Sequence, residues 1–473
     1  MQMRIGGAEI ASPDERWIDV RNPATGEIID RVPYGTPEDV SSAVEAAASA
    51  TDAWKKKTMR ERGMVFFHAA SRVREQHKEL AQLLTMEQGK PLREAIDEVR
   101  GFANILEFYA AISAQPSGEA VRLGAAGDCM VVREPLGVCG AIIPWNMPVI
   151  ILGWKVGPPL LAGNTLVVKP ASTTPLTSLR LAAILDEAGL VPGALNMVTG
   201  TGEETGEALV SHPGVRKISF TGSCTTGARV RELAQQKELI LELGGSDPMI
   251  VMDDADIRKA VEGAVRGRFY NAGQTCSAVK RLFVHEKIAP EFIRVLKERV
   301  AALNVGNGLG PKTDMGPLNS AGQRDRIARA VETARDQNEG TIIGGGALLG
   351  KAYEPGFFYR PTLVTNVTPE SGLMTEEIFG PVLPVMTVPD LDTAIRAANA
   401  TQYALGASVW TTDLQTTRRV FDEVHAGIVW VNRHLTVPPE IPFGGGGESG
   451  IGRENGHHAL EQYSRTKTLF LGW

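Results

Sequence analysis

One thiol in the sequence stands in a setting suited to chemistry. Residues 271–278 read NAGQTCSA and place Cys276 among small and polar residues, directly after an amphipathic stretch. A cysteine attacks as its thiolate, which requires partial exposure and either nearby positive charge or oriented backbone amides. Gly273 would let the backbone approach a ligand closely, and no bulky apolar residue flanks the thiol. Because most lone cysteines are simply buried in a core, the segment by itself makes Cys276 a candidate nucleophile and no more.

A carboxylate offers a second candidate. Glu242 comes near the end of the apolar run Leu239–Leu243 and is followed by Gly244 and Gly245. In an open α/β sheet the ligand crevice lies beyond the carboxyl ends of the strands, so a glutamate there is placed to act as a general base. The alternative is a solvated charge at a strand end, which is the commoner case.

The elements that must position these two residues alternate between strands and helices. From Gly137 to Leu243 the order strand, turn, helix repeats, which predicts a parallel, doubly wound, Rossmann-like sheet. Its strands are expected at Gly137–Ile143, Thr165–Lys169, Leu195–Val198, Lys217–Phe220 and Leu239–Leu243.

Two glycine-bearing turns between these strands each lead into a helix. They span Gly200–Gly206 and Phe220–Gly227. Helix N-termini attract phosphate, so either turn could hold part of a dinucleotide. The first reads GxGxxxG instead of the usual GxGxxG, and a purely structural turn is an equally good interpretation.

The flanking regions have patterns of their own. A capping box at Thr58–Glu61 predicts one long helix toward Gln88, and residues 118–136 predict a protruding hairpin. A second alternating region after Gly245 predicts a second α/β domain. Its strands are expected at Met249–Met252, Arg281–Val284, Leu383–Val388, Ala407–Trp410 and Gly427–Val431. Composition predicts a mobile loop at Pro442–Gly447 and an extended run at Thr466–Trp473.

Composition excludes several classes of function. The 473 residues suffice for two or three domains, and 43% apolar and 22% charged residues are ordinary globular usage. A net charge of −6 without a basic block gives no footprint for nucleic acid or an anionic membrane. The four cysteines lie far apart without CxxC spacing, so we expect neither a metal site nor disulfides, and a reducing cytoplasm fits best. No secretory signal is readable at the N-terminus, and the longest apolar region, Leu136–Leu161, is interrupted by prolines.

Seven motifs occur in one order along the chain: IPWNMP at Ile143, VKP at Val168, FTGS at Phe220, LELGG at Leu241, GQTC at Gly273, EIFGP at Glu377 and PFGG at Pro442. Together they resemble the NAD(P)-dependent aldehyde dehydrogenase superfamily over essentially the whole length. The resemblance implies that Cys276 attacks the aldehyde, that Asn146 and the Cys276 amide hold the oxyanion, and that Glu242 activates the water that hydrolyses the thioester.

The resemblance also implies two binding regions. Coenzyme residues would be Ile143, Pro144, Trp145, Lys169, Ser172, Gly202, Gly206, Thr221, Gly222, Ser223, Leu243, Glu377 and Phe379. The substrate pocket would be lined by Met147, Trp154, Thr275, Ser277, Val437 and Phe443. Lys155 and Glu454 match charged residues of a proton relay, although a structural ion pair explains them equally well.

Three positions depart from common family patterns. Ser172 stands where many NAD-preferring members carry a glutamate, so we expect NADP+ to be accepted at least as well as NAD+, unless Ser172 merely caps the following helix. Gly447 stands where a lysine is common. Tyr270 stands where succinate semialdehyde dehydrogenases carry an arginine, which favours neutral aliphatic or aromatic aldehydes, although Arg268 or His434 could still supply a cation.

The expected organisation is a dinucleotide-binding domain at 1–117 and 137–244, a catalytic domain at 245–445, and a small β oligomerisation arm at 118–136 and 456–473. An isolated two-stranded ribbon is marginal in water, so a homodimer or homotetramer is expected. The leading function is oxidation of an aldehyde to the free acid. A dehydrogenase that transfers the acyl group to coenzyme A is the nearest alternative, against which Glu242 argues, and a catalytically silent structural protein is a more distant one.

Overall fold

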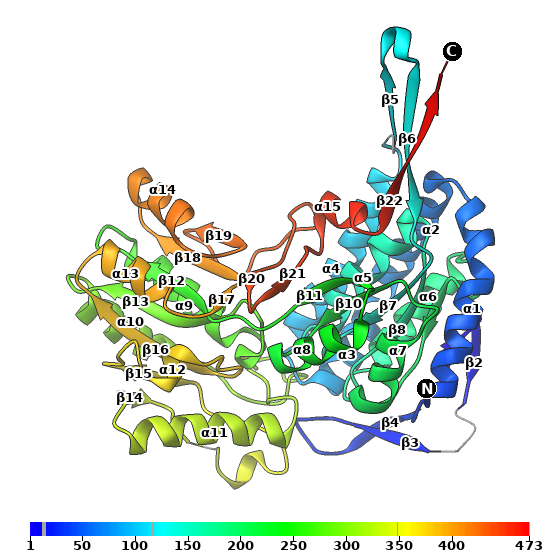
Figure 1. Cartoon of the computed structure of the whole chain (residues 1–473). Helices are drawn as coiled ribbons and strands as arrows, with labels where there is room; N and C mark the ends of the chain where they lie inside the picture. Colours follow the sequence, from blue (N-terminus) through cyan, green and yellow to red (C-terminus); the bar gives the residue numbers. More distant parts are fainter. Residues whose placement is uncertain (12–15, 116–117, 348, 473) are drawn as a thin grey trace.

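Two α/β lobes lie side by side, and a narrow β arm projects from one of them (Figure 1). The computed structural model describes residues 1–11, 16–115, 118–347 and 349–472. Within these ranges the lobes hold sheets of eight and seven strands and the arm a sheet of three. Trp473, the end of the expected tail, and residues 116–117 lie outside the described residues.

The first sheet has the order β2-β1-β9-β8-β7-β10-β11-β21, and its five strands from β9 to β11 run parallel. The chain lays down β7, β8 and β9 toward one edge and then β10 and β11 toward the other, so the winding reverses between β7 and β10. A ligand crevice forms at such a switch point. The predicted doubly wound sheet is confirmed. Its strands are β1 (Met3–Ile5), β2 (Ala8–Ile10), β7 (Val138–Ile142), β8 (Thr165–Lys169), β9 (Leu195–Met197), β10 (Lys217–Thr221), β11 (Glu238–Glu242) and β21 (Gly450–Ile451).

Helices cover both faces of this sheet. Alternate residues of β8 enter different hydrophobic clusters, Val167 on the side of α1, α7 and α8 and Val168 on the side of α2 to α6. Burial on both faces explains why these strands read as continuous apolar runs in the sequence. The helices are α1 (Pro37–Lys56), α2 (Met59–Glu75), α3 (His77–Gln88), α4 (Leu92–Ile112), α5 (Pro148–Ala162), α6 (Leu176–Glu187), α7 (Glu207–Ser211) and α8 (Cys224–Ala234).

The predicted single helix from the Thr58 capping box to Gln88 was wrong, because the chain breaks it at Gln76 into α2 and α3. Gln76 leaves helical geometry (φ −97°, ψ 10°), and its side-chain oxygen accepts a hydrogen bond from Arg180 on α6 at 2.7 Å. Neither glycine nor proline marks this break in the sequence. The feature that accompanies it is a contact with a distant residue, which the local sequence does not show.

The second sheet has the order β14-β15-β16-β13-β12-β18-β19 and is parallel except for β14. The sequence analysis missed β14 and β15, which are too short for their period to be read. The strands are β12 (Asp247–Val251), β13 (Val279–His285), β14 (Thr341–Gly344), β15 (Thr362–Thr365), β16 (Val382–Val388), β18 (Gly406–Trp410) and β19 (Ile428–Val431). The helices are α9 (Ile257–Phe269), α10 (Ala289–Ala301), α11 (Ala321–Asp336), α12 (Gly372–Thr375), α13 (Leu391–Ala398) and α14 (Leu414–Glu423).

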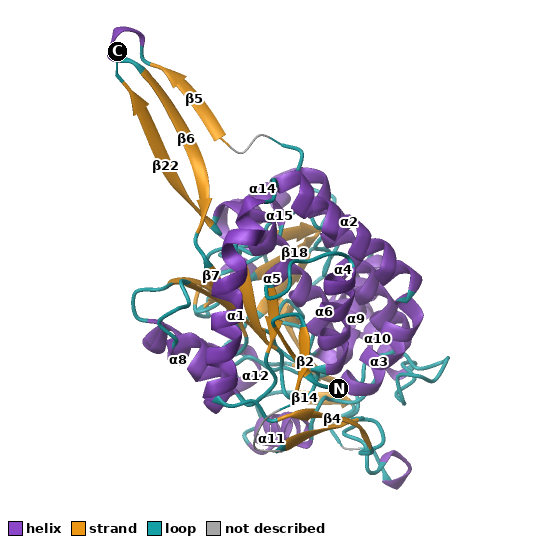
Figure 2. Cartoon of the chain, turned by 90° about the vertical axis from the view of Figure 1, so that its right-hand side faces the viewer, coloured by secondary structure: helices purple, strands orange, loops and turns teal. Residues whose placement is uncertain are grey.

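The arm consists of β5 (Gly118–Arg122), β6 (Asp128–Pro135) and β22 (Ser464–Leu471), all antiparallel (Figure 2). The expected arm range 456–473 begins differently, because α15 (Gly456–Glu461) packs on α5 and Tyr463 is buried in the first core. No described helix has the length and apolar character that crossing a membrane requires.

The glycine-rich stretch near the C-terminus is paired, not an open loop. Phe443 exchanges two backbone hydrogen bonds with Glu454, at 2.7 and 2.8 Å. Beyond it, β20 (Gly446–Gly447) pairs with β17 (Tyr403–Ala404), and β21 pairs with β11 of the first sheet. The stretch therefore links the two lobes. A further two-stranded sheet near the N-terminus pairs β3 (Trp17–Arg21) with β4 (Ile28–Pro33).

Candidate active site

Cys276 lies where two cavities meet. A cavity of about 140 Å³ lies on one side and one of about 180 Å³ on the other, and Ile151 and Cys276 line both. The loop before Cys276 turns sharply after α9, because Asn271, Ala272 and Gly273 all have positive φ (51°, 53° and 74°). At Gly273 a side chain would collide with the carbonyl of Gly380, so only glycine fits this approach.

Hydrogen bonds fix this loop against the segment that carries Asn146. The Asn146 side-chain amide donates to the carbonyl of Gln274 at 3.0 Å, and the Asn271 side-chain amide donates to the carbonyl of Asn146 at 2.8 Å. Asn146 itself is buried at the end of the β7 segment and lines the smaller cavity with Cys276. The two residues that the sequence analysis assigned to the nucleophile and the oxyanion site are thus neighbours.

The smaller cavity gathers most of the residues expected to bind coenzyme. Its lining comprises Pro144, Trp145, Asn146, Ile151, Thr221, Gly222, Ser223, Leu243, Gly244, Cys276, Gln323, Arg326, Glu377 and Phe379. Trp145 and Phe379 meet edge to face with ring centroids 5.6 Å apart. A side chain at Gly244 would collide with the Glu377 carboxylate, and the Gly245 amide donates to that carboxylate at 3.1 Å. The sequence analysis missed Gln323 and Arg326, which give no signal because they look like ordinary polar residues of the amphipathic α11.

Five expected coenzyme residues lie outside that lining. Ile143 donates its amide to the carbonyl of Lys169 at 3.0 Å. The Lys169 ammonium is buried, bonds the carbonyls of Pro170 and Gly200 at 2.9 and 3.2 Å, and has its pKa lowered to about 8 by burial. Gly202 and Gly206 bound a short turn of π-helix beside the Lys169 side chain.

Ser172 is partly exposed and lies in a turn before α6. The alternative that Ser172 caps the following helix is wrong, because α6 begins at Leu176 with Pro175 in the cap position. The buried Glu87 instead accepts the free amides of Leu176 and Thr177 at 2.8 and 2.9 Å. Ser172 is therefore available for another role.

The larger cavity gathers every residue expected in the substrate pocket. Its lining comprises Asp97, Met147, Ile150, Ile151, Trp154, Arg266, Tyr270, Thr275, Cys276, Ser277, Leu435, Val437 and Phe443. Trp154 and Phe443 stack obliquely with centroids 5.1 Å apart. Asp97, Ile150, Ile151, Arg266 and Leu435 were missed. Asp97 and Arg266 are exposed, and their opposite charges cancel within the lining.

The two cations considered for this pocket do not line it. Arg268 is completely buried and donates to the carbonyls of Ile378 and Gly380. His434 bonds Ser408 and the carbonyl of Ser277, and burial lowers the pKa of its imidazole to about 4, so the ring is neutral. Neither Arg268 nor His434 therefore supplies a cation to the pocket, and the cation in its lining is the exposed Arg266.

Glu242 lines neither cavity. Its side chain is buried beside Gly444, with no hydrogen-bond partner for either carboxylate oxygen among the described residues. Burial, followed by the nearby Glu454, raises its pKa well above the usual range, while Lys155 opposes the shift. Lys155 in turn pairs with Glu454 and donates to Ser219 at 2.9 Å.

The thiol of Cys276 is not ionised by its surroundings. Burial raises its pKa to about 12. Lys280 opposes this effect, whereas the carboxylates of Asp247, Glu242 and Glu377 add to it. Of the two sources of stabilisation expected for the thiolate, oriented amides or nearby positive charge, the second is supplied by one cation, Lys280, which was not identified from the sequence.

Buried charged residues of the α3–α4 hairpin form hydrogen bonds with the backbone of the site. They were not expected from the sequence. Lys90 pairs with Glu98 and donates to the carbonyl of Asn146 at 2.9 Å. Glu98 also accepts from the amide of Val149 at 2.8 Å, and Glu94 accepts from the amide of Asn271 at 2.8 Å. One hairpin therefore fixes both the Asn146 segment and the loop of Cys276.

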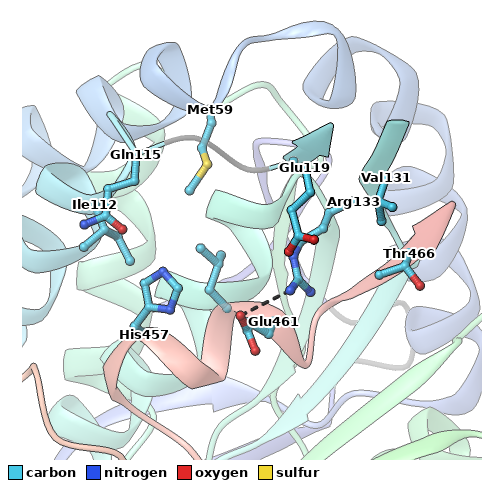
Figure 3. A pocket seen from close by; sticks show the side chains of 11 residues that line it. Met59, Ile112, Gln115, Glu119, Val131, Arg133, His457, Glu461 and Thr466 are labelled. Carbon is cyan, nitrogen blue, oxygen red and sulfur yellow. Dashed lines mark hydrogen bonds and ion pairs between the residues drawn. The ribbon is translucent and has the colours of Figure 1, made fainter. Parts of the chain in front are cut away.

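A cavity of about 270 Å³ at the base of the arm is larger than either cavity at Cys276. Figure 3 shows Arg133 and Glu461 paired across it, at 3.2 Å. None of the expected catalytic residues lines it, so size alone does not locate the chemistry. Among the described residues no group of three or more His, Cys, Asp or Glu could hold a metal ion.

Comparison with known proteins agrees with this arrangement. Residues 10–469 match the model of the aldehyde dehydrogenase family. The chain is 41% identical to a betaine aldehyde dehydrogenase from Rhizobium etli (strain CIAT 652), over 99% of this chain and 96% of that one. It is 40% identical to a phenylacetaldehyde dehydrogenase from Pseudomonas fluorescens, over 100% and 96%.

Solved structures agree as well. PnpE from Pseudomonas sp. WBC-3, crystallised with nicotinamide adenine dinucleotide, superposes with a TM-score of 0.97 at 37% identity, over 100% of this chain and 97% of that one. An NADP-dependent enzyme from E. coli superposes with a TM-score of 0.97 at 35% identity, over 100% and 98%. The chain belongs to the aldehyde dehydrogenase family and is an oxidoreductase that converts an aldehyde to the carboxylic acid with NAD(P)+.

Proposed function

We propose that Cys276 carries the reaction as a covalent nucleophile, and the observation that carries this proposal is its position in the wall of both cavities. An aldehyde in the larger cavity and a coenzyme in the smaller one would then both reach the same sulfur. The thiolate adds to the carbonyl carbon and forms a thiohemiacetal, with the negative charge on the former carbonyl oxygen. NAD(P)+ supplies the acceptor for the hydride that leaves this carbon, after which a thioester remains on Cys276.

The smaller cavity suits such a coenzyme. Gly222 and Gly244 in its wall leave no room for a side chain, so backbone approaches the cavity directly. Ser223, which lines this cavity, also caps the N-terminus of α8, and a helix N-terminus is a favourable site for phosphate. We assign the pyrophosphate contacts to Thr221, Gly222 and Ser223 and the nicotinamide ribose to Glu377.

Asn146 is proposed to stabilise the oxyanion together with the Cys276 amide. Its side-chain amide bonds the carbonyl of Gln274, two residues before Cys276, and has a second N–H to donate. One preorganised donor of this kind is worth about 3 kcal/mol of barrier. The buried Lys90–Glu98 pair supports this role because Lys90 holds the backbone of Asn146.

Glu242 is proposed to remove a proton from the water that opens the thioester. A raised pKa suits a general base that works near neutral pH, because the carboxylate is then a stronger base than an ordinary glutamate. The carboxylate reaches the thioester only after its side chain turns away from Gly444. We assign the onward transfer of that proton to Lys155 and Glu454, which pair with each other.

We propose neutral aromatic or alkyl aldehydes as substrates, with phenylacetaldehyde as the first to test. The larger cavity is walled by Met147, Trp154, Val437 and Phe443, and its one carboxylate, Asp97, is exposed and offset by Arg266. The formal charges of the lining would therefore give a cationic aldehyde no net attraction. Comparing kcat/KM for phenylacetaldehyde and betaine aldehyde tests this choice, and a tenfold preference for betaine aldehyde would contradict it.

The arm is proposed to join copies of the chain into a homodimer or homotetramer. Leu469 and Phe470 on β22 are 52% and 54% exposed, and the edges of the arm sheet are unpaired in the described chain. Such edges promote pairing with another chain. Light scattering on the purified protein measures the number of subunits.

We divide the chain into a coenzyme lobe around the first sheet, a catalytic lobe around the second and the oligomerisation arm, with the boundaries expected from the sequence except that α15 joins the first lobe. We place the enzyme in the cytoplasm, because its four cysteines are all unpaired.

A further inference from the structure

Lys280 is a buried cation that the proposed reaction does not use. It is the second residue of β13, where every residue is buried, and its side chain is 1% exposed. Burying an ammonium is costly unless partners satisfy it. The identity of those partners therefore indicates what the residue does.

The partners of Lys280 belong to both halves of the site. Its ammonium donates to the carbonyls of Thr275, at 3.1 Å, and of Cys276. It also forms an ion pair with Glu377 at 3.2 Å and lies 5.7 Å from the centroid of the Phe379 ring. One ammonium thus joins the backbone of the nucleophile to two residues that wall the coenzyme cavity.

The neighbouring cation behaves differently. Arg281 is equally buried, but its guanidinium donates to the carbonyls of Ser246, Ala397 and Ala398, at 2.9, 2.9 and 2.8 Å. These carbonyls belong to neither cavity lining. Arg281 is therefore a matched control for the loss of a buried cation from the same strand.

The charges around the thiol of Cys276 indicate that Lys280 affects its ionisation. The carboxylates of Asp247, Glu242 and Glu377 raise the pKa of the Cys276 thiol, and Lys280 is the cation that lowers it. Asp247 is buried and forms no ion pair of its own in the described chain. Without Lys280 the thiolate would lose the cation that offsets the effect of these carboxylates on it.

We propose that Lys280 is a positioning residue with two effects: it holds Glu377 and Phe379 in the coenzyme wall, and it stabilises the thiolate of Cys276. This proposal rests on the proposed role of Cys276 as the nucleophile. Through this one ammonium, the geometry of the coenzyme wall and the reactivity of the nucleophile depend on each other.

The first test measures the thiol in the protein without coenzyme. The alkylation rate of Cys276 by iodoacetamide is followed against pH, with the modified peptide quantified by mass spectrometry. Lys280→Met should slow alkylation about tenfold at pH 8 and move the profile to higher pH, because an opposite charge nearby has been lost. Lys280→Arg should keep most of the rate, and Arg281→Met should shift the profile much less than Lys280→Met, because Arg281 acts on Asp247 and not directly on the thiol.

The second test measures coenzyme binding directly, by fluorescence titration with NADP+ and NAD+. Lys280→Met and Glu377→Gln should weaken binding to a similar extent, about tenfold, because both remove a charge-assisted contact in the same wall. Glu377→Gln should not slow alkylation, since it removes a carboxylate near the thiol. The paired result separates the two effects of Lys280.

A lowered melting temperature for Lys280→Met with unchanged alkylation and binding would make the residue purely structural and overturn the proposal. If Lys280→Met does not fold, Glu377→Gln decides, and unchanged coenzyme binding in that variant overturns the proposal. An active Cys276→Ser enzyme would refute the nucleophile, whereas the alkylation and binding measurements need no turnover, so the two failures are distinguishable.

Discussion

The two cavities that meet at Cys276 are built in different ways. The coenzyme side is walled largely by short contiguous segments, Pro144–Asn146, Thr221–Ser223 and Leu243–Gly244, which follow strands of the first sheet. The proposed substrate side has one short segment, Thr275–Ser277, and is otherwise walled by side chains from many elements, including Asp97 on α4, Trp154 on α5 and Arg266 on α9. A contiguous backbone wall leaves a motif in the sequence, whereas a wall of scattered side chains does not.

This difference explains why the class of reaction is easier to infer than the substrate. Backbone walls require particular residues, as at Gly244, where any side chain would meet Glu377. Scattered side chains need only fit together, and many combinations fit. Substitutions on the two sides should therefore fail in different ways.

The largest effect should come from the residue that both sides share. Cys276→Ser should lower kcat by about a thousandfold or more, because a serine hydroxyl without an adjacent base is hardly ionised. Coenzyme binding should change by about twofold at most, since Cys276 is one of many lining residues. Steady-state assays and a coenzyme titration on the same preparation measure both, and near-normal turnover would contradict the assignment.

Glu242 belongs to neither cavity, so its loss should leave the first half of the reaction intact. Glu242→Gln should give a burst of reduced coenzyme close to one per active site and then a steady state about a hundredfold slower. Stopped-flow absorbance resolves the two phases. Unchanged steady-state turnover at saturating substrate would remove Glu242 from the mechanism.

The pH dependence of Glu242 has a definite sign. Burial and Glu454 raise its pKa above the ordinary 4.5. A base must be deprotonated, so thioester hydrolysis should be fastest above the raised pKa and fall as the pH decreases through it. In Glu242→Gln this acidic fall should disappear from the slow steady state, and its persistence would assign the titration to another group.

The fold could be inferred largely from the sequence, for an identifiable reason. The parallel strands of the first sheet are buried on both faces, so β8 reads as an uninterrupted apolar run with the boundaries Thr165 and Lys169. The break at Gln76 could not be inferred, because the contact seen there comes from an arginine far away in the sequence. The strand β15 could not be inferred, because four residues are too few to show a period.

The site could be inferred where a motif or an unusual residue marks it, but not where ordinary charges support it. Cys276 stands out in its segment, but Glu94 and Glu98 look like ordinary helix charges. Their partners are backbone amides of Asn271 and Val149, which lie far away in the sequence. Lys280 could not be recognised either, because nothing in the sequence shows that its position in the strand is buried.

The substrate side should discriminate against a distal carboxylate. Succinate semialdehyde would place an anion among Trp154, Val437 and Phe443, and a charge there is costly because Asp97 already offsets the one cation of the lining, Arg266. We expect kcat/KM about a hundredfold below that of phenylacetaldehyde. Tyr270→Arg, which adds a cation to the lining, should raise kcat/KM for succinate semialdehyde, with Tyr270→Phe as the control. Equal rates for the two aldehydes in the unaltered enzyme would contradict an apolar pocket.

The smallest effect should lie at the far end of the coenzyme site, where Ser172 precedes α6 without capping it. Two anions about 4 Å apart near a protein surface repel by about 4 kcal/mol before screening, so a glutamate here would disfavour the 2′-phosphate of NADP+. Serine lacks that charge and can donate a hydrogen bond, and the neighbouring Lys169 is a cation of the same segment, although backbone carbonyls hold its ammonium.

Ser172→Glu should therefore shift the ratio of kcat/KM for NAD+ over NADP+ at least about tenfold toward NAD+, because the ribose hydroxyls gain an acceptor worth about 1.5–3 kcal/mol. Ser172→Gln adds length without charge and should move the ratio less, which separates repulsion from bulk. Both coenzymes are compared at fixed aldehyde concentration. A tenfold preference for NAD+ in the unaltered enzyme would contradict the expectation, and it would move coenzyme choice from Ser172 to contacts deeper in the cavity.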